Sequence, residues 1–490
     1  MLKRSFFAAL TTTSLLLGGQ CHAAPAGDTR VAKIPAQKPG PRSVATDPPA
    51  ATHLANGVVE TTLANGMKLV CRPEPGVPLV ALQVFVRVGS GQETEGLAGI
   101  GSFVARTLTA STTTRSPDTI SAEIRDLGGN LVVNRQPDWT QISVLTVPDR
   151  FTNAMDLITD VLKDATFDSD VVEDKRQEIL ADIDSGEASP FDRTYTNLRK
   201  AMFAGTGYGL PALGTPRSIR HLQREQLVAY YNRYFVPKNY VVVVAGDVDP
   251  DVVRSTIEHD MADYNPFLRG SRRGDPSQTV VPQLSDDVQP VHAVQPDLNQ
   301  VCLMVGYRAP SMSSEDYAAL QVINALLGGM KSSRLFTAVR EKQGLAYQLG
   351  SFYTPMIYAG DFTGYVFAAP TRLDPQAKKR VPTLPAITAE LKKQFDSLET
   401  TPPTEAELTR AKHYVIGSYK IKHERIQDRA YLLGIAELTA SDGARLDTNF
   451  ADYVNAVTVA DIQRVAKKFF VHPAISVLEP PTGSEGMITE

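Results

Sequence analysis

Cysteine is scarce in this sequence: only three occur in 490 residues, and Cys21 lies in the first segment. Cys71 and Cys302 each lie within an apolar run typical of a β-strand, so we expect two buried thiols rather than a disulfide. Isolated thiols also exclude a cysteine zinc site, which needs clustered thiolates. No excess of one charge exists either, because 50 Lys and Arg face 54 Asp and Glu. A net charge of −4 excludes the strong field that attracts nucleic acid or an acidic membrane, so we expect protein or peptide ligands.

Histidine is also sparse, and its spacing is informative. Two His residues four positions apart on a helix lie on the same face, and in many peptidases such a pair coordinates zinc. No two of the eight histidines in this chain are four residues apart, so no helix can offer such a face: His22, His53, His221, His259, His292, His413, His423 and His472.

The first segment has the features of a secretory signal peptide. MLKRSFFAALTTTSLLLGGQCHAAPAGD has a basic start, an apolar stretch over 6–17 and small residues before Ala24. We expect a signal peptide over 1–23, and therefore an exported, periplasmic protein. Lipid attachment at Cys21 is the less favoured alternative, because Gln20 stands where a small residue is required. No later run approaches the ~20 apolar residues of a membrane helix, so no membrane segment is expected after cleavage.

The remaining chain divides into two halves of similar length. Each half ends in an amphipathic helix, an aromatic pair, a proline and an apolar strand, with Phe235 and Phe470 in equivalent places. Such self-similarity indicates duplication. Long helices mixed with strands, without regular βαβ alternation, predict an α+β fold with helices packed on antiparallel sheets. We expect a flexible leader rich in Pro and Ala over 24–56, followed by a first domain over 57–265. A Pro-rich linker over 266–294 joins it to a second domain over 295–482, and a tail follows over 483–490.

Several blocks carry a resemblance to a known family. In order along the chain they are TTLANGMKLV, VRVGSGQETEGLAGIGSFVARTLTASTTTRS, LGGNLVVNRQPDWTQISVLTVPDRF, VVEDKRQEILADI, YGLPALGTPRSIRHLQREQLVAYYNRYFVPKNYVVVVAGDVDP and LLGGMKSSRLFTAVREKQGLAYQLGSF. Together they resemble the smaller-chain branch of the insulinase, pitrilysin and mitochondrial-processing-peptidase family (M16). The resemblance implies two homologous α+β domains in the processing-peptidase fold, clamped against a second such chain around a closed cavity.

The metal motif of that family is missing. Its enzymes carry His-x-x-Glu-His on a helix, where the two His residues bind zinc and the Glu activates water. The block GLAGIGSFVARTL places Ser102, Ala105 and Arg106 at those positions, and EDKRQEILADI places Asp182 at the third ligand. The resemblance therefore implies a degenerate site without zinc. We also expect Arg106 and Asp182 to form a partly buried pair, with Glu178 as the competing acceptor.

A second motif of the family is retained. REKQGLAY supplies Arg340 and Tyr347, seven residues apart. We expect the helix to stop at Gly344, with Arg340 near its end and Tyr347 just beyond it. In two-chain members such a pair holds substrate over the zinc of the other chain, so the resemblance implies substrate binding. The alternative is structural: Arg340 pairs with a local carboxylate and Tyr347 packs in the core.

Together with the signal peptide, the resemblance implies a zinc-less, substrate-binding or regulatory subunit of a heterodimeric periplasmic zinc endopeptidase. It would act on peptides only with a homologous His-x-x-Glu-His partner that holds the zinc, and we expect no peptidase activity from this chain alone. The alternative is a non-enzymatic scaffold or peptide-binding protein derived from the same fold.

Overall fold

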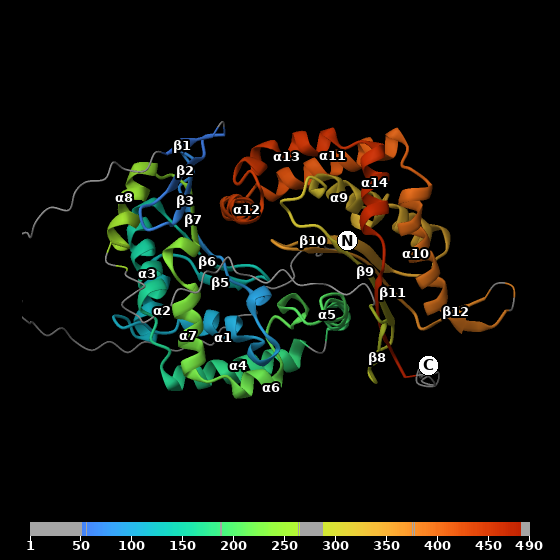
Figure 1. Ribbon diagram of the computed structural model, residues 1–490, viewed down its shortest axis with the longest axis horizontal. Coiled ribbons are helices and arrows are strands. Elements are labelled where there is room, and N and C mark those ends of the chain that lie inside the picture. The colour runs from blue at the N-terminus through green and yellow to red at the C-terminus, as the bar shows by residue number, and fades with distance from the viewer. Residues whose placement is uncertain are drawn as a thin grey trace, which may run out of the picture. The chain divides into compact units, whose positions relative to one another are not determined.

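Two β-sheets form the centre of the protein in the computed structural model (Figure 1), which describes residues 51–481 except 55, 187–188, 263, 265–287, 375 and 377. The first sheet has the order β1-β2-β3-β7-β4-β6-β5, with β1 Thr52–His53, β2 Val59–Thr62, β3 Lys68–Pro73, β4 Val80–Val86, β5 Leu131–Arg135, β6 Thr140–Thr146 and β7 Tyr240–Gly246. The second has the order β10-β11-β9-β14-β8, with β8 Val291–Val294, β9 Val301–Ala309, β10 Gln348–Pro355, β11 Gly360–Ala368 and β14 Ala474–Glu479.

The two sheets repeat one topology. β5-β6-β4-β7-β3 corresponds strand for strand to β10-β11-β9-β14-β8. Each sheet is antiparallel except for one parallel pair, β3 with β7 and β8 with β14. Phe235 and Phe470 end equivalent helices, and their N–H groups donate to Tyr231 O and Ala466 O at the same N···O distance of 2.9 Å. The predicted duplication and α+β class are confirmed, although the parallel pairs make the sheets mixed rather than purely antiparallel.

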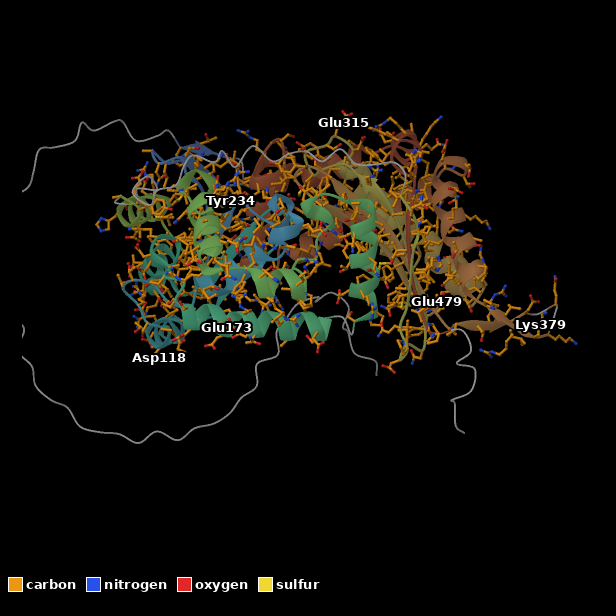
Figure 2. All side chains as sticks on the ribbon, turned by 60° about the horizontal axis from the view of Figure 1, so that its bottom comes forward. Asp118, Glu173, Tyr234, Glu315, Lys379 and Glu479 are labelled. Carbon is orange, nitrogen blue, oxygen red and sulfur yellow. The ribbon has the colours of Figure 1, made fainter. Side chains whose placement is uncertain are left out.

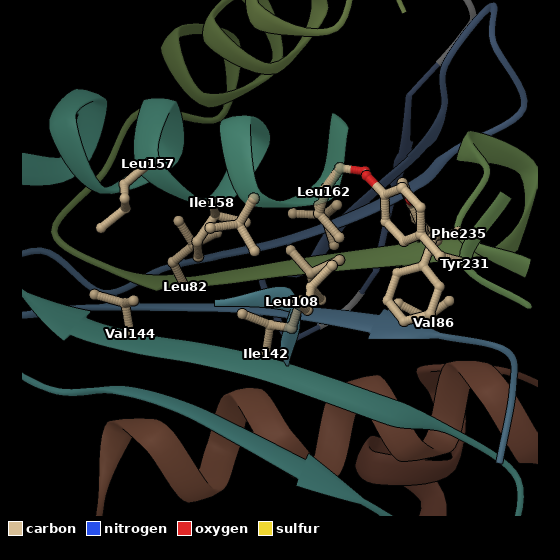
Figure 3. Packing of buried hydrophobic residues seen from close by; sticks show 14 of the residues in the cluster. Leu82, Val86, Leu108, Ile142, Val144, Leu157, Ile158, Leu162, Tyr231 and Phe235 are labelled. Atoms are coloured by element: carbon tan, nitrogen blue, oxygen red, sulfur yellow. The ribbon is translucent and has the colours of Figure 1, made fainter. Parts of the chain in front are cut away.

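The helices of the first half other than α5 share one core with the first sheet, packed on its strands or on one another: α1 Ile100–Leu108, α2 Pro117–Asp126, α3 Phe151–Asp164, α4 Ser169–Gly186, α6 Pro216–His221, α7 Arg224–Tyr234 and α8 Pro250–Asp260. In Figure 3 Leu157, Ile158 and Leu162 of α3 face Leu82 and Ile142 on the strands. Tyr231 joins this core, and its hydroxyl donates to Leu162 O at 2.6 Å.

The second half has the corresponding helices α9 Tyr317–Asn324, α10 Leu384–Thr400, α11 Glu405–Lys422, α13 Arg445–Ala456 and α14 Val459–Phe469, with two π-helical segments, η7 Ala325–Gly329 and η8 Phe336–Lys342. Short 3-10 turns are η1 Ser90–Gln92, η2 Glu95–Leu97, η3 Pro148–Arg150, η4 Gly207–Gly209 and η5 Pro237–Asn239. The strands β12 Thr371–Leu373 and β13 Arg380–Pro382 form a separate hairpin, with exposed Lys379 near its end (Figure 2).

The opposite face of each sheet is covered by a helix from the other half. α12 (Ile426–Thr439) packs on β4 and β7, and α5 (Pro190–Met202) packs on β9 and β14 (Figure 1). The central strands are therefore buried on both faces, which explains their continuous apolar sequences such as YVVVVAG in β7. Because of this exchange, the two halves form one unit, Pro49–Glu490, rather than separate domains in a row.

Some predicted boundaries need correction. The signal peptide, most of the leader, the linker residues 266–287 and the tail lie outside the described residues. Thr52–His53 form β1 inside the expected leader, and Val291–Val294 form β8 inside the expected linker. Both segments pair with strands because they complete the sheet edges. No helix in the described part of the chain has the length and apolar character to cross a membrane.

The two cysteines behave as expected. Cys71 and Cys302 are buried and unpaired. Burial raises the pKa of each thiol to about 12, so both stay protonated at neutral pH.

Candidate functional site

Helix α1 carries three of the four positions assigned to the degenerate metal site. Its N-cap is Gly99, with φ of 87°. The carboxylate of Glu93 accepts the N–H groups of Gly99 at 2.8 Å and Gly101 at 2.9 Å, and so satisfies donors at the helix start. Ser102 lies one turn before Ala105 and Arg106 on this helix, as their spacing predicts.

These residues do not fit a zinc ion. The Ser102 hydroxyl donates to Ala212 O at 2.6 Å, and Ala105 has no ligand atom. Arg106 brings a positive charge to a ligand position, which leaves Asp182 on α4 as the one anionic oxygen donor of the four. Within the ranges that the structure describes, no three His, Cys, Asp or Glu side chains gather in a way that could hold a metal.

Arg106 and Asp182 meet, as expected. Arg106 Nη2 lies 2.7 Å from Asp182 Oδ2. Glu178 does not compete, because Lys175 Nζ binds it at 2.7 Å. The side chains of Arg106 and Asp182 are 31% and 51% exposed, so the expectation of a partly buried pair is wrong for the carboxylate. Water therefore reaches both charges.

Arg135 on β5 is a residue of this region that the sequence analysis missed. Its Nη1 donates to Ser102 Oγ at 3.2 Å and to Ala212 O at 3.1 Å, while Nη2 forms a short ion pair with Glu93. The Arg135 and Glu93 side chains are 7% and 0% exposed. Burial raises the pKa of Glu93, while Arg135 and the two backbone N–H groups act in the opposite direction. Since the two residues are 42 positions apart, no local spacing reveals the pair.

Arg340 and Tyr347 lie together at the end of η8. Gly344, with φ of 59°, follows this helix, so the predicted stop is confirmed although the helix is π-type. The Arg340 guanidinium carbon lies 4.6 Å from the centre of the Tyr347 ring and 5.0 Å from that of Phe336. Arg340 Nη1 also donates to Tyr347 O at 3.3 Å.

The structural alternative for these two residues is not supported. Tyr347 is 77% exposed, so it is no core residue. Arg340 makes no ion pair with any carboxylate in the described ranges; its positive charge is held by two aromatic faces instead. The arrangement places a cation held between two rings and an exposed tyrosine directly before β10, the edge strand of the second sheet.

Two family models and several known proteins are similar to this chain. A family model described as Insulinase (Peptidase family M16) matches residues 68–216, and one described as Peptidase M16 inactive domain matches 221–415. An uncharacterized zinc protease of Mycobacterium leprae (strain TN) is 30% identical over 316 residues, covering 64% of this chain and 70% of that protein. One from Bacillus subtilis (strain 168) is 25% identical over 423 residues, covering 86% and 98%.

Three solved structures share the fold. A protease from Helicobacter pylori gives a TM-score of 0.77 at 20% identity, covering 89% of this chain and 100% of that one. A peptidase M16 inactive domain from Pseudomonas fluorescens gives 0.72 at 20% identity, covering 86% and 98%. A chain of Complex III2 from Candida albicans gives 0.70 at 18% identity, covering 86% and 95%.

Proposed function

The chain belongs to the insulinase family of peptidases, M16, and from this premise we propose that it is the zinc-less, substrate-binding subunit of a heterodimeric periplasmic zinc endopeptidase. The observation that carries the proposal is a contrast between two sites. The positions of the metal motif hold a set of groups that does not fit zinc, whereas Tyr347 is exposed and Arg340 has no carboxylate partner in the described ranges. A chain that served only as a scaffold has no need of such an unneutralised pair.

The division of work follows from the side chains. A partner with His-x-x-Glu-His would hold the zinc, which when bound polarises the scissile carbonyl and lowers the pKa of water. In this chain, Arg340 would orient the peptide through the guanidinium N–H groups that Tyr347 O does not use. Tyr347 would donate a hydrogen bond from its hydroxyl to the carbonyl oxygen on which negative charge develops. Export rests on the signal-peptide pattern over 1–23.

Co-expression with an exported homologue that has the intact motif tests the proposal. Each chain alone and the mixture are assayed on a peptide library, with and without a chelator, and a partner whose motif Glu is changed to Gln serves as the control. We expect hydrolysis only by the mixture with the intact partner. Chelator-sensitive hydrolysis by this chain alone would contradict the proposal. A partner equally active without this chain would favour the scaffold function, for which the fold likeness to a Complex III2 chain is the supporting observation.

A further inference from the structure

Arg135 contacts the degenerate metal site from outside the elements that carry the family's motif. Its Nη1 lies 3.2 Å from Ser102 Oγ, the side chain at the first ligand position. Arg106, one turn further along α1, places a second guanidinium on the same helix face. Two guanidinium groups therefore adjoin the positions that a zinc site would use, and each is paired with a carboxylate.

The contacts of Arg135 are those of a built structure rather than of a surface residue. Nη2 binds the fully buried carboxylate of Glu93, whose two oxygens also accept N–H groups from the first turn of α1. Nη1 binds Ser102 and the backbone carbonyl of Ala212. One guanidinium thus joins three segments: the turn before α1, the helix itself and the loop after η4.

The backbone makes room for this arrangement at Gly101. A Cβ atom on this residue would stand 2.5 Å from Arg135 Nε and 2.7 Å from the Tyr230 hydroxyl. Any other residue at 101 would displace the guanidinium or the tyrosine. The helix is therefore fitted to the presence of Arg135.

We infer that Arg135 is a built-in cation that replaces a bound metal at this site: it neutralises Glu93, holds α1 in place and excludes a divalent ion even when ligands are supplied. A guanidinium stays protonated at all physiological pH values and offers only N–H donors, so Arg135 contacts the side chain at the first ligand position without supplying a lone pair to a metal. The inference concerns this chain alone, and it holds whether or not a partner subunit exists.

Rebuilding the ligand set tests the inference. The first variant carries S102H, A105E, R106H and D182E, and the second adds E93Q and R135L, which remove the buried charge pair together. Both are dialysed against zinc and then against buffer, and zinc per chain is measured by atomic emission. Circular dichroism confirms folding. We expect about a tenth of an equivalent or less in the first variant and about one equivalent in the second. Stoichiometric zinc in the first, or none in a folded second variant, would overturn the inference.

A stability comparison in the otherwise unchanged chain keeps the inference testable if the rebuilt variants do not fold. R135L alone strands a buried carboxylate, whereas R135L with E93Q does not. We expect a lower melting temperature for the single variant than for the double variant. Equal melting temperatures of R135L and the unchanged protein would show that Arg135 holds nothing in place, and would contradict the inference.

Discussion

Gly434 on α12 lies against the ring of Phe85 on β4. A Cβ atom at Gly434 would stand 2.1 Å from Cε2 of that ring, so the exchanged helix approaches the first sheet as closely as a glycine allows. Gly434→Ala should therefore destabilise the protein by about 1–3 kcal/mol through overpacking, despite the better helix propensity of Ala. Urea denaturation measures this change.

Gly417 on α11 is the matched control, because a Cβ there meets nothing within 4 Å. Gly417→Ala should leave the stability unchanged or raise it by up to about 1 kcal/mol. Equal effects of the two substitutions would mean that α12 does not pack closely on the sheet in solution.

The Arg106–Asp182 pair should contribute little to stability. Exposed ion pairs gain only about 0–1 kcal/mol, and both of these side chains are accessible to water. Arg106→Ala and Asp182→Ala should each change the free energy of unfolding by less than about 1 kcal/mol, and a double-mutant cycle should give a coupling of a few tenths. A loss of several kcal/mol in either variant would show that the pair is buried in solution.

How far the sequence predicts this structure depends on whether the information is local. The helix, Phe, Pro and strand pattern at Phe235 and Phe470 revealed the duplication, because both copies keep the same local order. The seven-residue spacing likewise brought Arg340 and Tyr347 together.

Non-local features escaped the sequence analysis. An apolar helix face can pack on either sheet, and the sequence does not indicate which one. The packing of α5 on the second sheet and of α12 on the first was therefore not predicted. The Glu93–Arg135 pair joins a turn and a strand far apart in the chain, and nothing in either segment identifies the other. Spacing predicted the contact between Arg106 and Asp182, but exposure depends on the surrounding packing.

His423, at the end of α11, makes the contact between α11, α13 and β3 contribute a stability that depends on pH. Its Nε2 lies 2.6 Å from Asp447 Oδ1, and Asp447 also binds Arg72 on β3. Burial lowers the pKa of His423, but the hydrogen bonds to Asp447 and to the Tyr419 carbonyl outweigh it, so the net pKa is raised. Burial raises the pKa of Asp447, but its hydrogen bond to His423 is the chief of several interactions that outweigh burial, so the net pKa is lowered.

The sign of the effect follows from these directions. The stabilisation from His423 is complete below the pKa of about 6.5 in the unfolded chain and is lost as pH rises through the folded value. The stabilisation from Asp447 is complete above its unfolded pKa of about 3.9, and it is lost as pH falls through the lowered pKa of Asp447 in the folded protein. His423→Gln should therefore cost on the order of 1 kcal/mol more near pH 5.5 than near pH 8.5. Urea denaturation at both pH values measures the difference, and His413→Gln, at an exposed position, should show none.

Tyr347 should act in the chemical step of the assembled enzyme. In the proposed complex the hydroxyl of this exposed residue would stabilise an oxyanion, and such a donor strengthens as charge develops. Tyr347→Phe should therefore lower kcat of the reconstituted pair by roughly ten- to a thousand-fold with little change in KM.

Arg340→Ala should mainly raise KM, because it removes a group that holds the peptide in ground state and transition state alike. Neither substitution should prevent association, which size-exclusion chromatography can establish. Tyr453→Phe, at another exposed tyrosine, should leave both constants unchanged. If Tyr347→Phe and Arg340→Ala also retain the kcat and KM of the unchanged pair, the two side chains are structural, and the non-enzymatic scaffold becomes the better account of this chain.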